Sequence, residues 1–272
     1  MLKVSPWRIT NDDSFFQRAL NVLERLHGIE VVGADCDVVL VVGAKQIGMS
    51  EVVKLARRLN LPEDKLLGDW IVCVPGFTLD KYRKLQRSRL SIFAMNCFGG
   101  LISNMLGLPF RSPTVNMFFL EKEFVRFLRA LRVYMEENLT LKTTHFDKGT
   151  ELNYPVVTLG GVEIHMNHYR DFNEAVKIWN RRKARINWYN LFVTAYTESE
   201  DIAREFDALP FGKKVCFVPF KSDLDSAWHI NPEIKRGLEF WDIVNHFGTG
   251  DPFYYDPFDM LLYGKKTPLI EM

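Results

Sequence analysis

The sequence is poor in cysteine, has no long apolar run and carries almost no net charge. Its four cysteines among 272 residues include no C-x-x-C pair, which is typical of a reducing compartment and excludes a disulfide framework. The longest apolar stretch, residues 38–44, is far too short to span a bilayer. Residues 1–13 lack the apolar centre of a signal peptide. The sequence therefore predicts a cytoplasmic protein with no membrane span.

The charge balance excludes one class of partner and favours another. With 35 basic and 34 acidic residues the net charge is +1, so we expect no nucleic-acid partner. Residues 89–195 carry 14 basic and 9 acidic side chains, whereas residues 196–272 carry 8 and 14. A basic middle segment favours a small phosphorylated or carboxylated ligand. The alternative for most of these charges is a solvated helix face.

The first 75 residues predict alternating helices and strands. Helices are expected at 14–26 and 50–59, and strands at 29–32, 38–42 and 70–74. The apolar run 38–42 is typical of a strand buried on both faces of a parallel sheet. We predict an α/β protein in which residues 1–88 form a small Rossmann-like module packed on a larger α/β domain, residues 89–272, with a mixed sheet. The sequence leaves the oligomeric state open.

Gly43 and Gly48 bound a turn between the strand at 38–42 and the following helix. Met49 stands where a P-loop needs lysine, and Lys45 stands where a dinucleotide fingerprint needs its second glycine. The turn is a candidate cofactor- or anion-binding site at a helix N-terminus, with the cofactor unknown. A tight strand–helix turn without a ligand is the alternative.

Downstream, the pattern predicts a second set of helices and strands. A helix with an apolar face is expected at 121–137, and a last helix from Pro232 to Gly248. Gly160-Gly161 between two apolar segments indicates a hairpin. Asp171 and Glu174 have capping-box spacing and predict a helix start.

The segment Asn96-Cys97-Phe98-Gly99-Gly100 lies between a predicted strand and a short predicted helix. A helix N-terminus favours the thiolate, so Cys97 is a candidate nucleophile with a lowered pKa. Gly99 and Gly100 would leave backbone N–H groups to face an oxyanion or a phosphate, with Asn96 beside them. The alternative is a small buried cysteine next to a glycine turn.

Two histidines, His165 and His168, follow a predicted strand. Either is a candidate general base, with neighbouring polar groups to orient it. As a metal site the pattern is weak, because no third ligand is spaced nearby and the cysteines are isolated, so we expect no metal. The alternative for each is a structural histidine.

A third candidate site lies at the end of the helix that starts near Asp171. Arg182 and Arg185, with Asn187, could bind a diphosphate or carboxylate. A solvated helix face is the alternative, and it is favoured for Arg181 and Lys183.

Four motifs together resemble a bacterial family of unknown function that is commonly labelled exopolysaccharide or capsular polysaccharide biosynthesis protein. They are Asn96-Cys97-Phe98-Gly99-Gly100, Ser112-Pro113-Thr114, Glu163-Ile164-His165 with His168-Tyr169, and Trp179…Arg182…Arg185-Ile186-Asn187. The resemblance covers residues 89–196 and implies a cytoplasmic role on activated sugars or their acyl donors.

These observations lead to two hypotheses for function. The first is a transferase with Cys97 as nucleophile or anion-site residue, His165 or His168 as base, and Arg182 and Arg185 as an anion clamp. The second is a non-catalytic module that recognises a nucleotide-sugar or a partner enzyme through the same residues.

Overall fold

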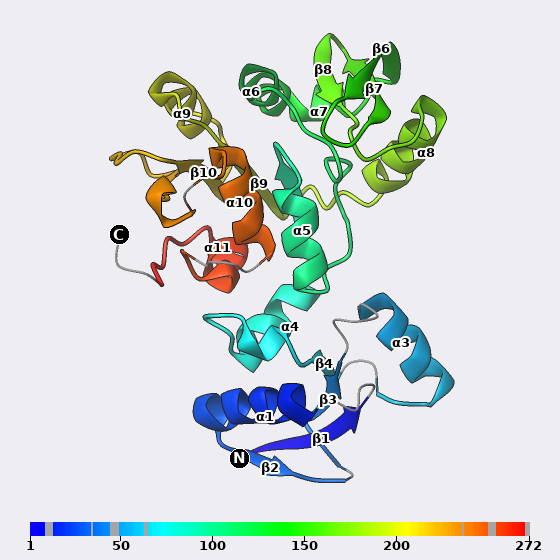
Figure 1. Ribbon diagram of the computed structural model, residues 1–272, viewed down its shortest axis with the longest axis vertical. Coiled ribbons are helices and arrows are strands. Elements are labelled where there is room, and N and C mark those ends of the chain that lie inside the picture. Colours follow the sequence, from blue (N-terminus) through cyan, green and yellow to red (C-terminus); the bar gives the residue numbers. More distant parts are fainter. Residues whose placement is uncertain are drawn as a thin grey trace. The chain divides into compact units, whose positions relative to one another are not determined.

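The computed structural model describes residues 1–8, 13–33, 35–43, 49–62, 65–235, 237–249 and 254–269. These residues divide between two compact units. Unit 1 comprises Met1–Arg83 and Asn104–Leu108, and unit 2 comprises Lys84–Ser103 and Pro109–Met272. Each unit combines helices with sheet (Figure 1), which confirms the predicted α/β class. The proposed domain boundary at residue 88 stays a prediction.

Unit 1 contains a four-stranded parallel sheet in the order β2-β1-β3-β4. The strands are β1 (Leu2–Arg8), β2 (Ile29–Val31), β3 (Val38–Val42) and β4 (Leu66–Gly68), and the helices are α1 (Asp13–His27) and α3 (Met49–Arg58). The connections β1-α1-β2 and β3-α3-β4 run in opposite directions from the sheet centre. Right-handed crossovers therefore place α1 and α3 on opposite faces, as in a doubly wound fold.

One predicted strand of unit 1 is wrong. Residues 70–74 were expected to be a strand, but Ile71–Cys73 form a short 3-10 helix, η2. The strand beside β3 is β4 instead, paired at Leu40 with Leu67. An apolar run of this length does not distinguish a strand from a buried helical turn, and here the fully buried Leu66–Gly68 occupies the sheet position.

Unit 2 contains a second four-stranded parallel sheet in the order β11-β10-β9-β5. Its strands are β5 (Ser91–Ala94), β9 (Leu191–Tyr196), β10 (Lys214–Val218) and β11 (Ala227–His229). Strand β5 is the outermost strand of this sheet and runs parallel to β9. The residues that follow Ala94 therefore lie where the carboxyl ends of the strands meet, which is the carboxyl edge of the sheet. Ligands of parallel α/β sheets bind at this edge.

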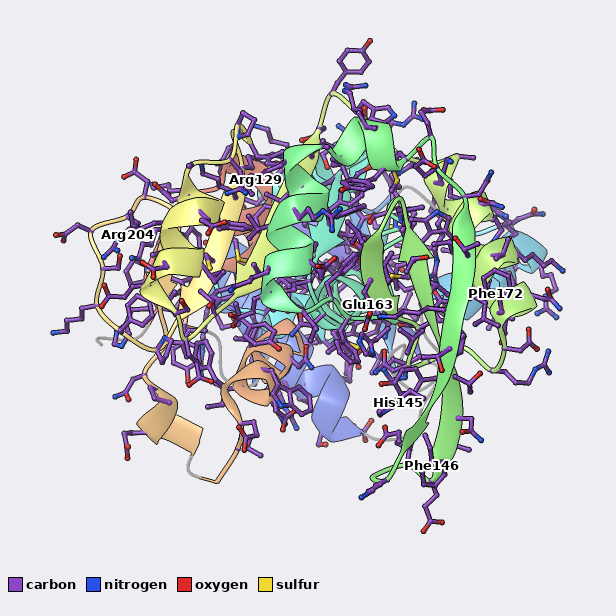
Figure 2. The ribbon with its side chains drawn as sticks, turned by 90° about the horizontal axis from the view of Figure 1, so that it is seen from above. Arg129, His145, Phe146, Glu163, Phe172 and Arg204 are labelled. Carbon is purple, nitrogen blue, oxygen red and sulfur yellow. The ribbon has the colours of Figure 1, made fainter. Side chains whose placement is uncertain are left out.

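An antiparallel three-stranded sheet completes unit 2. It consists of β6 (Leu139–Asp147), β7 (Leu152–Leu159) and β8 (Val162–His165). Gly160 and Gly161 join β7 to β8 with φ of 55° and 85°, which confirms the predicted hairpin. Figure 2 shows His145 and Phe146 near the far end of the β6–β7 hairpin, and the Phe146 side chain is exposed.

Helix α6 (Glu121–Arg129) connects the two sheets of unit 2. It contacts β8, β9 and helix α9 (Glu200–Asp207), and its Phe124, Phe127 and Leu128 are buried among residues of both sheets. The helix predicted at 121–137 is divided. At Ala130 the backbone leaves the helical region, with φ of −129°, and α7 (Leu131–Tyr134) follows.

The remaining elements are α4 (Leu79–Arg87), α5 (Phe98–Met105), α8 (Phe172–Lys183), η3 (Pro232–Lys235), α10 (Phe240–Thr249) and α11 (Pro257–Tyr263). The single last helix predicted from Pro232 to Gly248 is wrong, because a 3-10 turn and α10 share that range. Among the described residues, none of the helices combines the length and apolar character that a membrane crossing requires.

Candidate functional site

Cys97 and His168 meet at the carboxyl edge of the parallel sheet of unit 2. Cys97 follows strand β5, and His168 lies in the turn after β8. The Cys97 Sγ atom is 3.3 Å from His168 Nε2, although the two residues are 71 positions apart. The structure thus brings a predicted nucleophile and a predicted base to hydrogen-bond distance.

Local hydrogen bonds fix Cys97 at the start of α5. Asn96 Oδ1 accepts a bond from Phe98 N at 3.2 Å, and Cys97 O accepts the first helical bond, from Leu101 N at 3.0 Å. Cys97 is therefore the last residue before the helix, where the backbone N–H groups of the first turn lack intrahelical partners. Gly99 N and Gly100 N have no acceptor within the described part of the chain.

The two glycines of this turn have a packing role that the sequence did not indicate. A Cβ at Gly99 would lie 2.8 Å from Ala94 Cβ, and one at Gly100 would lie 3.0 Å from Val115 Cγ1. Helix α5 therefore approaches β5 and residue 115 more closely than any other residue type allows. The same contacts hold the first-turn N–H groups in place.

Replacing Gly99 by alanine is expected to destabilise the protein by about 1–3 kcal/mol, because the added methyl group overpacks the contact with Ala94. Urea denaturation would measure the change. Gly212→Ala is the matched control: a Cβ there meets nothing within 4 Å, and we expect a change within about 0.5 kcal/mol. Equal effects of the two substitutions would contradict close packing at Gly99.

The electrostatic environment of Cys97 differs from the sequence prediction. Burial raises the pKa of the thiol to about 11, whereas a lowered pKa was expected at the helix N-terminus. The resting thiol is therefore protonated at neutral pH, and a nearby base is needed to activate it. His168 Nε2 is within reach of that proton.

Two buried amide groups flank this pair in the chain. Asn96 precedes Cys97 and Asn167 precedes His168. Asn96 Nδ2 and Asn167 Oδ1 are buried without a hydrogen-bond partner in the described structure. Buried polar atoms are normally paired, so the residues that precede Cys97 and His168 carry an unpaired donor and an unpaired acceptor.

His165 belongs to a different cluster, on the antiparallel sheet. Its ring stacks on Phe118 with centroids 4.4 Å apart, its Nε2 is 3.1 Å from Glu163 Oε1, and its Nδ1 is 3.3 Å from the Tyr154 hydroxyl. Burial lowers the pKa of His165, and the Glu163 carboxylate partly opposes this change. These contacts involve Phe118, Tyr154 and Glu163 and not Cys97. Of the two predicted bases, the structure pairs His168 with the thiol.

Arg182 is a buried residue of α8, and one nitrogen of its guanidinium group makes hydrogen bonds within the described structure. Its Nη1 donates to Val115 O at 2.9 Å and to the Tyr169 hydroxyl at 2.7 Å, and Tyr169 in turn donates to Val115 O. The guanidinium also lies over the Phe110 ring, 5.1 Å from its centroid. Arg182, one of the two arginines of the predicted anion clamp, therefore has a structural role. Its other guanidinium nitrogens have no acceptor among the described residues.

Asn187 has a structural role at the opposite edge of the sheet. Its backbone N donates to Ser91 Oγ at 2.8 Å, and its Nδ2 donates to Arg89 O at 3.0 Å. Ser91 begins β5 and Cys97 follows its end, so at ~3.3 Å per residue the strand itself separates them by about 10 Å. That Asn187 helps Arg182 and Arg185 to bind an anion stays a prediction. Arg185 precedes Asn187 and is exposed.

The glycine turn of unit 1 is only partly described. Gly43 has φ of 87°, and its N–H donates to Asp69 Oδ2 at 2.8 Å in a buried position. A carboxylate thus already occupies the N–H that a bound anion would use. Gly48 lies outside the described residues. The sequence does not reveal Asp69 as the acid that follows the neighbouring strand, because the apolar pattern predicts that strand at 70–74 and not at Leu66–Gly68.

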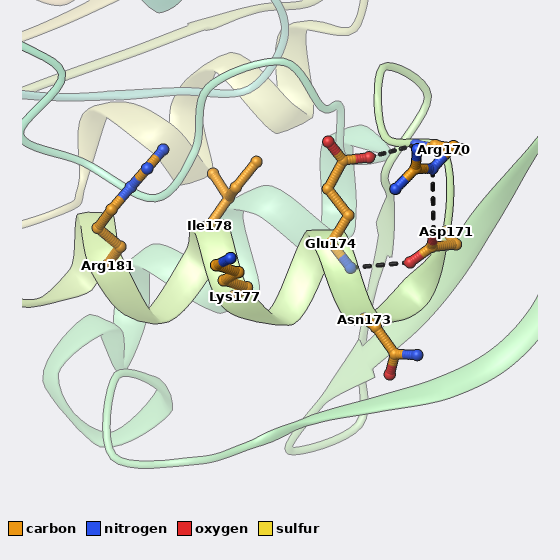
Figure 3. A pocket seen from close by; sticks show the side chains of 7 residues that line it. All are labelled: Arg170, Asp171, Asn173, Glu174, Lys177, Ile178 and Arg181. Atoms are coloured by element: carbon orange, nitrogen blue, oxygen red, sulfur yellow. Dashed lines mark hydrogen bonds and ion pairs between the residues drawn. The ribbon is translucent and has the colours of Figure 1, made fainter.

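A surface hollow of about 410 Å³ lies along the outer side of α8 (Figure 3). Arg170, Asp171 and Glu174 contact one another at one end of it, whereas Lys177 and Arg181 have no ion pair in the described structure. The hollow contains neither Cys97 nor a histidine. In the described ranges no three cysteine, histidine or acidic side chains come together to hold a metal ion.

Two comparisons place the chain among known sequences. The family described as a domain of unknown function, DUF1919, matches residues 72–264. An uncharacterized protein of Haemophilus influenzae is 33% identical over 183 residues, which are 65% of this chain and 84% of that relative. The matched family range contains Cys97, His168 and Arg182 but none of strands β1–β4. Neither description carries the polysaccharide label that the resemblance implied.

Proposed function

The chain belongs to the DUF1919 family, whose description names no reaction, and we propose from the site itself that it is a transferase with Cys97 as nucleophile. The observation that carries the proposal is the 3.3 Å distance between Cys97 Sγ and His168 Nε2. A nucleophile at hydrogen-bond distance from a base is the arrangement that covalent catalysis requires.

The donor class that fits this pair best is an acyl thioester. His168 Nε2 accepts the thiol proton while Sγ bonds to the acyl carbon, and the donor's carbon–sulfur bond breaks. The departing thiolate takes the proton from His168. A hydroxyl group of the acceptor then attacks the acyl–enzyme and gives its proton to His168, which returns it to Cys97. The free N–H groups of Gly99 and Gly100 are the donors available to the oxyanion.

The resemblance of the motifs to polysaccharide biosynthesis proteins extends the proposal. We propose that the acceptor is a sugar of a surface polysaccharide precursor and that the reaction takes place in the cytoplasm. An activated sugar is the second donor class: Sγ bonds to the anomeric carbon, the bond from that carbon to the nucleoside diphosphate breaks, and the thiol proton passes through His168 to the departing diphosphate.

A covalent intermediate is the test of this function. We expect intact-protein mass spectrometry to show an added acyl group after incubation with acyl-coenzyme A thioesters, or an added glycosyl group after incubation with nucleotide-sugars. Peptide mapping should locate the group on Cys97, and Cys97→Ala should abolish it. Cys73→Ala is the matched control, because Cys73 is an exposed thiol in unit 1 and its loss should leave the adduct unchanged.

Burial of the thiol favours a second candidate function, a non-catalytic module that binds a nucleotide-sugar or a partner enzyme. A protonated thiol with a pKa of about 11 is a weak nucleophile unless a base assists it. If a donor raises the melting temperature but leaves no adduct on Cys97, the binding module is correct and the transferase is not.

A further inference from the structure

Four arginines of unit 2 gather around the last turn of α8. Arg182 lies over the ring of Phe110, so the backbone of the next residue, Arg111, passes close to this turn. Arg185 begins the segment after the helix, with its backbone N donating to Arg182 O at 2.9 Å. Asn187 Nδ2 donates to Arg89 O at 3.0 Å and brings Arg89 to the same segment. We call Arg89, Arg111, Arg182 and Arg185 the arginine cluster.

The arginine cluster has no counter-charge in the part of the chain that the structure describes. None of the four guanidinium groups has a carboxylate within ion-pair distance there. Burial lowers the pKa of Arg111, and the charges of Arg89 and Arg185 lower it further. The carbonyl end of α8 supplies only about half of one negative charge. The positive charges therefore remain largely uncompensated.

Hydrogen-bond donors remain available within the cluster. Arg182 is 93% buried, and Nη1 is its one nitrogen with acceptors among the described residues. Its Nε and Nη2 form one edge of a planar fork, have no partner among the described residues and keep some access to solvent. Buried arginines are normally paired, because leaving a desolvated charge uncompensated is costly. A bound anion would supply both the charge and the acceptors.

We infer that the arginine cluster binds a phosphoryl group of a ligand. One guanidinium group binds two oxygens of a phosphate through two parallel hydrogen bonds. Because the cluster has four arginines, it can contact more than one phosphate. Tyr169 connects this site to the thiol, since its hydroxyl accepts from Arg182 while its chain neighbour is His168. The inference does not rest on the proposed function, because Cys97 is not part of the cluster.

Titration calorimetry with inorganic pyrophosphate, at constant ionic strength, tests this inference. We expect saturable binding by the full chain, weakened by about tenfold or more in Arg111→Gln, since one charge-assisted contact is lost. Arg111 is suited to this test because its side chain has no hydrogen bond in the described part of the chain. Arg204→Gln is the matched control: Arg204 is an exposed arginine on α9, and the affinity should change by less than about twofold.

Three results would overturn the inference. They are no saturable binding below about 10 mM pyrophosphate, equal weakening by Arg111→Gln and Arg204→Gln, and acetate binding as tightly as phosphate. Inorganic phosphate beside pyrophosphate distinguishes a single phosphoryl group from a diphosphate. Cys97→Ser should bind pyrophosphate like the parent chain, so failure of the thiol chemistry and failure of the anion site are separately visible. Circular dichroism of Arg111→Gln confirms that it is folded.

Discussion

Replacing Phe127 by alanine is expected to lower the free energy of unfolding by about 3–5 kcal/mol, the usual cost of deleting a fully buried aromatic ring. Phe127 has no exposed surface, and its ring lies 5.1 Å from that of Phe119 and 6.3 Å from that of Phe93. Phe93 belongs to β5 and Phe127 to α6, so the cavity would open where α6 joins the two sheets of unit 2.

Urea denaturation followed by circular dichroism measures this loss, and thermal melting should shift by roughly 10 °C. Lys122→Ala, an exposed substitution in the same helix, is the control and should change stability by less than about 0.5 kcal/mol. A loss below about 1 kcal/mol for Phe127→Ala would mean that the surroundings collapse into the space, and the core described here would then be wrong.

The elements found from the sequence are those with a clear local pattern of apolar residues or glycines. The helical spacing in α1 and α8, the apolar run of β3 and the glycines after β7 each predict their structure from neighbouring residues alone. Strand β6 was missed for the opposite reason. Thr140 to Phe146 are all exposed, so the strand has no alternation of buried and exposed residues to recognise.

Helix α4 was missed because charge conceals its apolar side. Leu79, Tyr82 and Leu85 are buried at helical spacing, but basic residues surround them in the sequence. Strand β1 was missed as well, with polar Lys3 and Ser5 and with Pro6 inside it. Its place at the centre of the sheet is fixed by pairing with β2 and β3, which no local pattern reveals.

For the candidate site, sequence reasoning found the residue types but not their grouping. Cys97 and His168 each follow a predicted strand. The end of the strand before Cys97 lies at the carboxyl edge of the parallel sheet, where the thiol meets His168. His165 differs from His168 by three positions, yet it faces the antiparallel sheet and Glu163. Arg111 went unnoticed because its role depends on Phe110 stacking against Arg182, a contact between residues 72 positions apart.

Replacing His168 by alanine is expected to slow the alkylation of Cys97 by iodoacetamide at pH 7.5 by about a hundredfold. Assistance by a positioned base contributes about 10²–10⁴-fold to proton transfer in comparable sites. Without the imidazole, the rate should depend on the thiol alone. Because burial raises the pKa of Cys97 to about 11, the thiolate fraction then increases about tenfold with each pH unit up to that value.

The pH profile distinguishes a base from a merely structural histidine. In the parent chain the rate at neutral pH should lie well above the line set by a thiol of pKa about 11, and in His168→Ala it should fall onto that line. His145→Ala is the matched control, since His145 contacts Tyr154 and His165 but not the thiol. Identical profiles for the parent chain and His168→Ala would show that the 3.3 Å contact moves no proton. In that case Cys97 is a half-buried thiol without a base, and the nucleophile assigned to the transferase is lost.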